Sequence, residues 1–248
     1  DPRESSGSEP AKGSMQVAWD AHWAFQPIAR PPIPPIPDAT WPKHPIDNFI
    51  LSRLLDADLQ PAADAEPLTL LRRATYHLLG LPPSADQIRD LLPLLREGQM
   101  ETVAATLLED PAYGEKQARH WLDLARYSDS NGVDENLAMT EAHRYRDYLV
   151  RAFNKDKPYN QFIAERVAGV LLASSLPTDE PFDALTATGF LALGPKMLAE
   201  QDKEKLVMDV VDEQADVLTK AVLGLSVGCA RCHDHKFDPI SSSDYYAL

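Results

Sequence analysis

The spacing of the apolar residues constrains the fold of this chain most. From Pro45 onward this spacing has the period of an α-helix almost throughout. Ile46, Phe49, Ile50 and Leu54 fall at i, i+3, i+4 and i+8, which places them along one side of an α-helix. No window alternates β-branched and polar residues as a series of strands would. The sequence therefore predicts an all-α, multi-helix domain, with further helices over 67–79, 84–96, 101–109, 112–128, 138–153, 159–173 and 203–225.

Local signals support these boundaries. Ser84, three residues before Gln87, is a capping-box start. Gly80-Leu81-Pro82-Pro83 and Asp110-Pro111 are helix breaks. In the last long helix, the predicted buried side consists of Val207, Val211, Leu218, Val222 and Leu225.

The N-terminal region differs in composition. Residues 1–16 are polar and lack a hydrophobic period, so we interpret them as a disordered tail or a cloning remnant. Ten of the 21 prolines lie in the first 45 residues. Proline fixes φ and removes an N–H donor, which favours an extended arm. We therefore expect a proline-rich arm over 17–45, packed on a helical domain that spans 46–248.

Charge and hydropathy exclude two classes of protein. The 248 residues include 24 Lys and Arg against 38 Asp and Glu, a net charge of −14. Nucleic-acid binding requires clustered basic residues that neutralise phosphates, so no nucleic-acid partner is expected. No apolar run approaches the ~20 residues that span a bilayer. The start also lacks a basic segment followed by an apolar one, so we expect any export signal to have been removed already.

The two cysteines lie together in Cys229-Ala230-Arg231-Cys232-His233. Thiols at i and i+3 share one side of a helical turn, so both can reach one porphyrin edge, and the next residue turns roughly 100° further. Cys-x-x-Cys-His is the attachment pattern of a single covalent haem c, with Cys229 and Cys232 as thioether anchors and His233 as proximal iron ligand. A zinc site that adds His235, a redox-active thiol pair and a plain disulfide remain alternatives.

Longer stretches around this motif resemble a known family. GLSVGCARCHDHKFDPISSSDYYAL, HWAFQPI, RHWLDLARYSDSNG, RYRDYLVRAFNKDKPYNQFIAERVAG and ATGFLALGPKM resemble the cytochrome c-like domain of large planctomycete multidomain proteins, over roughly residues 22–248. The resemblance implies one module of a longer exported protein of the periplasm or cell envelope. It also implies further domains beside this one and a link through gene context to the breakdown of sulfated polysaccharides.

The sixth iron ligand is left open between several residues. Met197, in Gly194-Pro195-Lys196-Met197, offers a thioether of the kind that raises a haem potential. His120 is the second candidate. His235 follows His233 too closely to reach the opposite face of the same haem, so we assign it to hydrogen bonding around the site. Weaker candidates, beside an open iron, are His143, His77, His44 and His22.

Three functions follow from these alternatives. A six-coordinate haem would transfer electrons to a redox partner or to other domains of the parent chain. An open iron would favour a haem enzyme acting on a carbohydrate or small substrate, and zinc would favour a structural module. A carboxylate face on the last long helix offers a solvated surface, a cation site or a docking site for a basic partner; it consists of Asp209, Asp212, Glu213 and Asp216.

Overall fold

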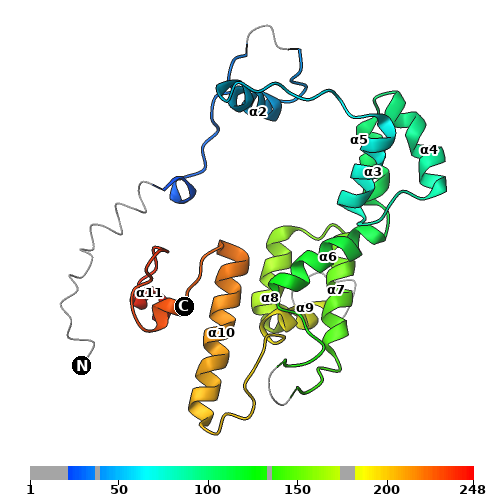
Figure 1. The fold of residues 1–248 in the computed structure, drawn as a ribbon. Helices are drawn as coiled ribbons and strands as arrows, with labels where there is room; N and C mark the ends of the chain where they lie inside the picture. The colour runs from blue at the N-terminus through cyan, green and yellow to red at the C-terminus, as the bar shows by residue number, and fades with distance from the viewer. Residues whose placement is uncertain (1–21, 37–39, 133–135, 174–181) are drawn as a thin grey trace. The chain divides into compact units, whose positions relative to one another are not determined.

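A computed structural model describes residues 22–36, 40–132, 136–173 and 182–248 (Figure 1). These residues form ten α-helices and no strand, so the predicted all-α class is confirmed. The predicted tail over 1–16 lies outside the described residues. None of the helices within the described ranges is long and apolar enough to cross a bilayer.

The chain divides into two compact units, Asp1–Glu66 and Pro67–Leu248. In the first unit, helix α2 (Pro45–Asp56) follows a short 3-10 turn, η2 (Trp23–Phe25), and an extended proline-rich stretch. The side-chain amide of Asn48 on α2 donates to the Pro34 carbonyl at 3.2 Å. The arm thus contacts α2 and belongs to the same compact unit as this helix. The sequence analysis had instead placed the boundary between the arm and the helical domain at residue 45.

The second unit begins with three helices around a small core: α3 (Pro67–Leu78), α4 (Ala85–Arg96) and α5 (Met100–Leu108). The Ser84 hydroxyl accepts from the Gln87 N–H at 3.1 Å, and the Gln87 side chain accepts from the Ser84 N–H at 2.9 Å. This confirms the predicted capping box at the start of α4. The core consists of Leu71, Ala74, Leu79, Leu91, Leu95, Val103 and Leu107.

An aromatic core follows, built by α6 (Ala112–Leu124), α7 (Ala142–Asn154), α8 (Tyr159–Leu172), α9 (Asp183–Ala187) and the 3-10 turn η3 (Thr188–Leu191). Tyr148 and Phe190 are almost fully buried in it. Gly169 on α8 lies directly against the Ala184 carbonyl, where a Cβ atom would overlap that oxygen. This close approach packs α9 onto α8.

The long helix α10 (Lys203–Leu223) positions the C-terminal segment. Asp202 caps its start, and Gly224, at φ 68°, ends it in the left-handed conformation that glycine adopts without strain. The chain then forms the 3-10 turn η4 (Gly228–Arg231) and the last helix, α11 (Ser242–Ala247), both of which pack together.

The prediction of which side of α10 is buried is only partly correct. Val207 and Val211 are 59% and 47% exposed, while Leu218, Val222 and Leu225 are partly buried. Val217, which the prediction left out, is 3% exposed and packs in the aromatic core. The periodic pattern identified an apolar side of α10, and the aromatic core covers only the C-terminal half of the helix.

Candidate functional site

Cys229 and Cys232 lie on or directly after the short turn η4, and both are free and exposed. Cys229 lies in η4 and Cys232 is the residue that ends it. Side chains three residues apart in a 3-10 turn eclipse each other, so we expect the two thiols to share one side of the turn. Ala230 between them is fully buried and packs with Val227, Ile240 and Tyr245. The turn is therefore held from one side by a small apolar cluster, while its thiol side stays open to solvent.

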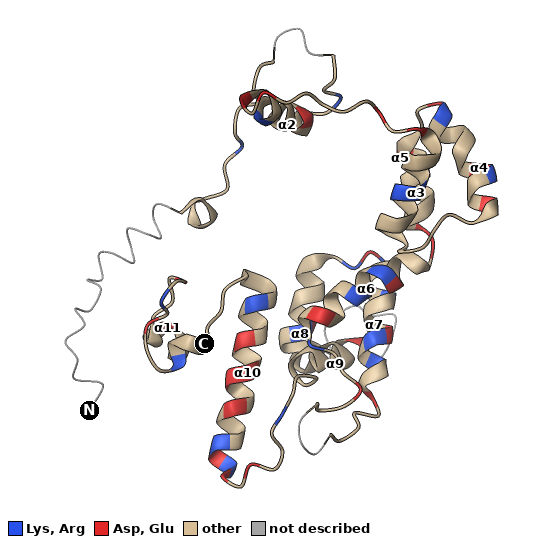
Figure 2. Cartoon of the chain, in the orientation of Figure 1, with Lys and Arg blue, Asp and Glu red and all other residues tan. Residues whose placement is uncertain are grey.

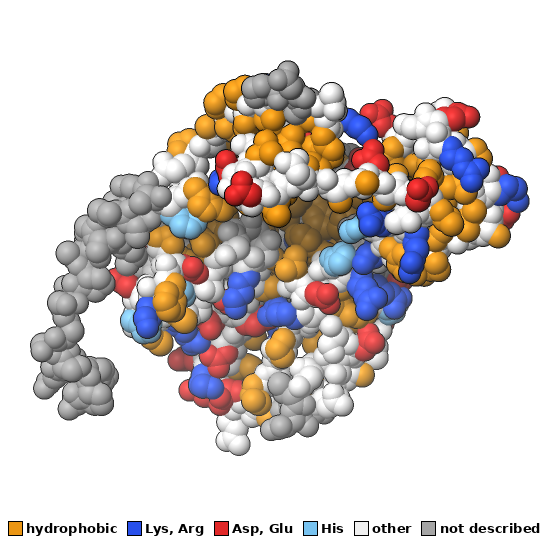
Figure 3. All heavy atoms as spheres, turned by 45° about the horizontal axis from the view of Figure 1, so that its top comes forward, with side chains coloured by type: hydrophobic (Ala, Val, Ile, Leu, Met, Phe, Trp, Pro, Cys, Tyr) orange, Lys and Arg blue, Asp and Glu red, His pale blue; other side chains and the backbone are white. Residues whose placement is uncertain are grey.

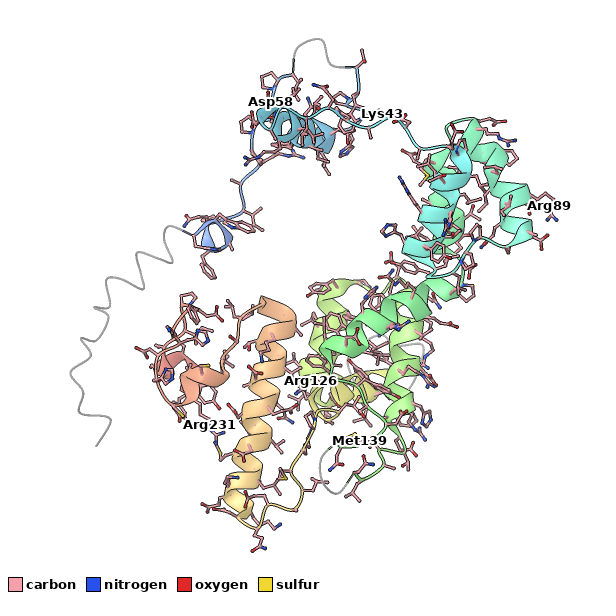
Figure 4. The ribbon with its side chains drawn as sticks, viewed as in Figure 1. Lys43, Asp58, Arg89, Arg126, Met139 and Arg231 are labelled. Atoms are coloured by element: carbon pink, nitrogen blue, oxygen red, sulfur yellow. The ribbon has the colours of Figure 1, made fainter. Side chains whose placement is uncertain are left out.

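Hydrogen bonds fix the turn against α10. The Gly228 N–H donates to Asp216 at 3.4 Å, and the Arg231 guanidinium donates to Asp209 at 3.0 Å and to Asp212 at 3.4 Å. Figure 4 shows Arg231 beside α10. The hydrogen bond from Arg231 holds the pKa of the Asp209 carboxyl below its ordinary value. The turn therefore runs back along α10, from Asp216 toward its N-terminal end.

Acidic residues of α10, red in Figure 2, form ion pairs with basic side chains of the same chain. Asp209 also pairs with Lys205 at 3.2 Å, and Asp216 pairs with Lys220 at 2.6 Å. Glu213 pairs with Arg126 and lies 3.9 Å from Lys196. Figure 3 shows acidic and basic side chains interleaved on the viewed face. Asp209, Asp212 and Asp216 thus dock the C-terminal segment on α10, whereas Glu213 binds basic groups that precede α10 in the chain.

His233 has one ring nitrogen engaged. Its Nδ1 lies 2.8 Å from the Asp234 carbonyl oxygen. A carbonyl can only accept, so Nδ1 donates this hydrogen bond, and in the neutral imidazole Nε2 then carries the lone pair. A hydrogen bond of this kind is what orients a metal-ligating histidine. The Asp234 carboxylate in turn accepts from the Ser242 N–H at 2.9 Å, which ties this residue to α11.

His235 has both ring nitrogens engaged. Its Nδ1 accepts from the N–H groups of Phe237 and Asp238 at 3.1 and 2.7 Å, so Nε2 carries the proton and faces the Ser226 hydroxyl at 3.3 Å. Ser226 donates from its hydroxyl and its N–H to the Asp238 carboxylate, both at 2.9 Å. The hydrogen bond from the Ser226 N–H is the main reason that the pKa of Asp238 is lowered. His235 thus holds the loop after His233 in place.

Two tyrosines of α11 complete the site, and the sequence analysis missed them. The Tyr246 hydroxyl donates to the Arg231 carbonyl at 2.9 Å, and the Tyr245 hydroxyl donates to Asp212 at 2.6 Å. Asp212 therefore joins Arg231 and Tyr245. The only available signal was the carboxylate spacing on α10, which does not show which basic or hydroxyl group it will meet.

The candidate sixth ligands come from other parts of the second unit. Met197 is 51% exposed in the turn before α10, and His120 is exposed on α6. No hydrogen bond described for residues 182–248 joins Met197 to the motif, and the contacts of η4 are chiefly with α10 and α11. The assignment of Met197 or His120 stays a prediction.

Three of the four weaker histidine candidates have local partners, and His77 is exposed on α3. His22 and His44 accept N–H bonds at the starts of η2 and α2, and His143 bonds the Thr140 carbonyl at 3.0 Å. In the part of the chain that the structure describes, no three His, Cys, Asp or Glu side chains are arranged to hold a metal ion. For zinc, His235 would have to give up the hydrogen bonds of its loop.

The residues present fit a covalently attached haem. Two unpaired thiols on one side of a turn can both form thioethers, and a tethered imidazole with a free Nε2 can bind iron. Residues 45–248 match the sequence model of PSCyt2, described as a protein of unknown function (DUF1549). The chain belongs to this family.

The PSCyt2 match confirms the resemblance at the level of the family, and it begins at residue 45, beyond the HWAFQPI stretch. Its description names no cofactor. Searches of curated proteins and of solved structures gave no match.

Proposed function

We propose that this PSCyt2 chain is a c-type haem-binding domain that transfers electrons within a larger exported protein. The observation that carries the proposal is the geometry of the motif: two free, exposed thiols lie three residues apart at η4, and Nδ1 of His233 is hydrogen-bonded to the Asp234 carbonyl oxygen. Such a haem supplies a one-electron iron couple.

The chain's own residues have distinct tasks in this function. Cys229 and Cys232 would hold the haem through thioethers, and His233 would supply the imidazole ligand to its iron. Arg231 holds the turn on α10 through two carboxylates. The hydrogen bonds among Ser226, His235 and Asp238 fix the loop that follows His233. This loop limits the movement of the His233 imidazole.

The partner and the location follow from this proposal. The redox partner is another domain of the parent chain or a soluble protein, and the net charge of −14 favours a basic one. Because haem c is attached outside the cytoplasm, we place the protein in the periplasm or cell envelope. The link to polysaccharide breakdown rests on the sequence resemblance.

The test is production in a host that attaches haem c, followed by intact mass and absorption spectra. We expect a mass increase of one haem in the native protein and none in Cys229→Ala/Cys232→Ala. His233→Ala should keep the thioethers and change the spectrum. Tyr76→Ala, which removes an exposed ring from α3, is the control and should change neither.

The spectra separate the candidate functions. Sharp low-spin bands in the reduced protein would support electron transfer. High-spin bands that shift when small ligands are added would refute it in favour of a haem enzyme with an open iron. No covalent haem would refute both, and metal analysis would then test the zinc-stabilised module.

A further inference from the structure

The aromatic core contains a buried cation that the proposed function does not use. Arg166 on α8 is 1% exposed. Its guanidinium carbon lies over the ring of Phe162, 4.9 Å from the centre of a Trp121 ring and 5.3 Å from that of Tyr148. The π faces of aromatic rings attract a cation. They do not accept strong hydrogen bonds from its N–H groups as an anion does.

No carboxylate of the described residues neutralises Arg166. The neighbouring Glu165 is fully buried, and it accepts hydrogen bonds from Tyr148 and Lys157, both at 2.6 Å, and from Gln161 at 2.9 Å. Lys157 and Glu165 cancel each other's charge. The core therefore keeps one uncompensated positive charge, and burial lowers the pKa of Arg166.

Several donors around this charge have no acceptor. Buried atoms without a hydrogen-bond partner include Nε and Nη2 of Arg166, the Tyr145 hydroxyl and Nε1 of Trp121. Burial raises the pKa of the Tyr145 hydroxyl, and the nearby Arg166 and Trp121 act in the opposite direction, which places both beside this hydroxyl. Each buried donor left without an acceptor is costly. The three side chains thus form a cluster of donors with a net positive charge.

We propose that this cluster binds a small monovalent anion of the halide class, of which chloride is the probe. Such an ion accepts from every one of these donors and neutralises Arg166, whereas a water molecule adds donors of its own and no charge. The site lies among α6, α7 and α8, apart from the cysteine motif, and does not depend on haem.

Thermal unfolding in sodium chloride and in sodium gluconate of equal ionic strength tests the proposal. An anion that binds only the folded protein stabilises it by mass action. At about ten times its dissociation constant, chloride should raise Tm by roughly 3–6 °C relative to gluconate. Chlorine NMR should show line broadening by the protein.

Conservative variants locate the effect. Tyr145→Phe and Trp121→Phe each remove one donor and keep a ring, so they should reduce the chloride-dependent Tm shift and the line broadening. Tyr76→Phe is the matched control, since Tyr76 also lies beside an arginine, Arg72, but is 43% exposed. Equal Tm values in both salts, or a shift unchanged in both Tyr145→Phe and Trp121→Phe, would overturn the proposal.

Discussion

Val227 is the residue through which the support of the cysteine motif can be measured. It is 1% exposed and packs with Ala230, Ile240 and Tyr245 beneath η4. Val227→Ala removes two buried carbon groups at ~0.8 kcal/mol each. The small cavity left behind adds to this, so we expect a total cost of about 2 kcal/mol.

The cost should appear locally, because the cluster under η4 is separate from the aromatic core. Amide hydrogen exchange is the assay. The N–H of Ala230 bonds the Val227 carbonyl and the N–H of His235 bonds the Ile240 carbonyl, both at 2.8 Å. A cost of about 2 kcal/mol should speed exchange at these amides roughly 30-fold, while α7 amides change little.

Val207→Ala is the matched control, since Val207 is 59% exposed on α10 and loses little burial. It should leave exchange at Ala230 and His235 unchanged. The reasoning would be refuted if Val227→Ala left these two amides as protected as in the native protein. It would also be refuted if α7 opened to the same extent, because the C-terminal cluster would then unfold only with the whole domain.

Three further predictions follow from packing and charge. Gly194→Ala should lower Tm because the new Cβ would overlap the Glu213–Arg126 pair, whereas Gly228→Ala meets only Asp216 at 3.5 Å and should be tolerated. Glu165→Gln should cost about 3 kcal/mol or more in chemical denaturation, since Lys157 would stay buried without its partner; Glu115→Gln, at an exposed site on α6, should cost little. Because the pKa of Asp238 is lowered in the folded protein, its stabilising effect is full above the ordinary carboxyl pKa and is lost as pH falls through the folded value. Acid titration of Asp238→Asn should therefore show a smaller loss of stability below about pH 4 than the native protein, and equal losses would contradict this.

Helix positions were largely readable from the sequence, since local spacing and capping determine them. Helices α3, α4, α5 and α8 lie within a residue or two of the predicted ranges. Helix α6 ends at Leu124, before the predicted 128, because Arg126 adopts a positive φ of 51°. Helix α7 begins at Ala142, after the predicted 138, because Ala138 forms an isolated bridge with Ser130.

The contacts around the cysteine motif could be predicted less well, since they join residues that are far apart in the sequence. The spacing of Cys229, Cys232 and His233 shows which groups are reactive. It does not show that Arg231 between them reaches Asp209 and Asp212. The acidic side of α10 therefore left a solvated surface, a cation site and a docking site open, whereas Asp209 and Asp212 bind the chain's own C-terminal segment.

The return of the chain along α10 after Gly224 has a consequence for folding kinetics. The contacts that hold the motif span fewer residues than the pairing of Arg126 with Glu213: Tyr245 to Asp212 spans 33 residues, Arg231 to Asp209 spans 22 and Ser226 to Asp238 spans 12. Contacts of low sequence separation form early, because little loop entropy is lost in closing them. The turn η4 and helix α10 should therefore reach their native arrangement together, as one hairpin-like unit. Longer-range pairings such as Arg126 with Glu213 should form later.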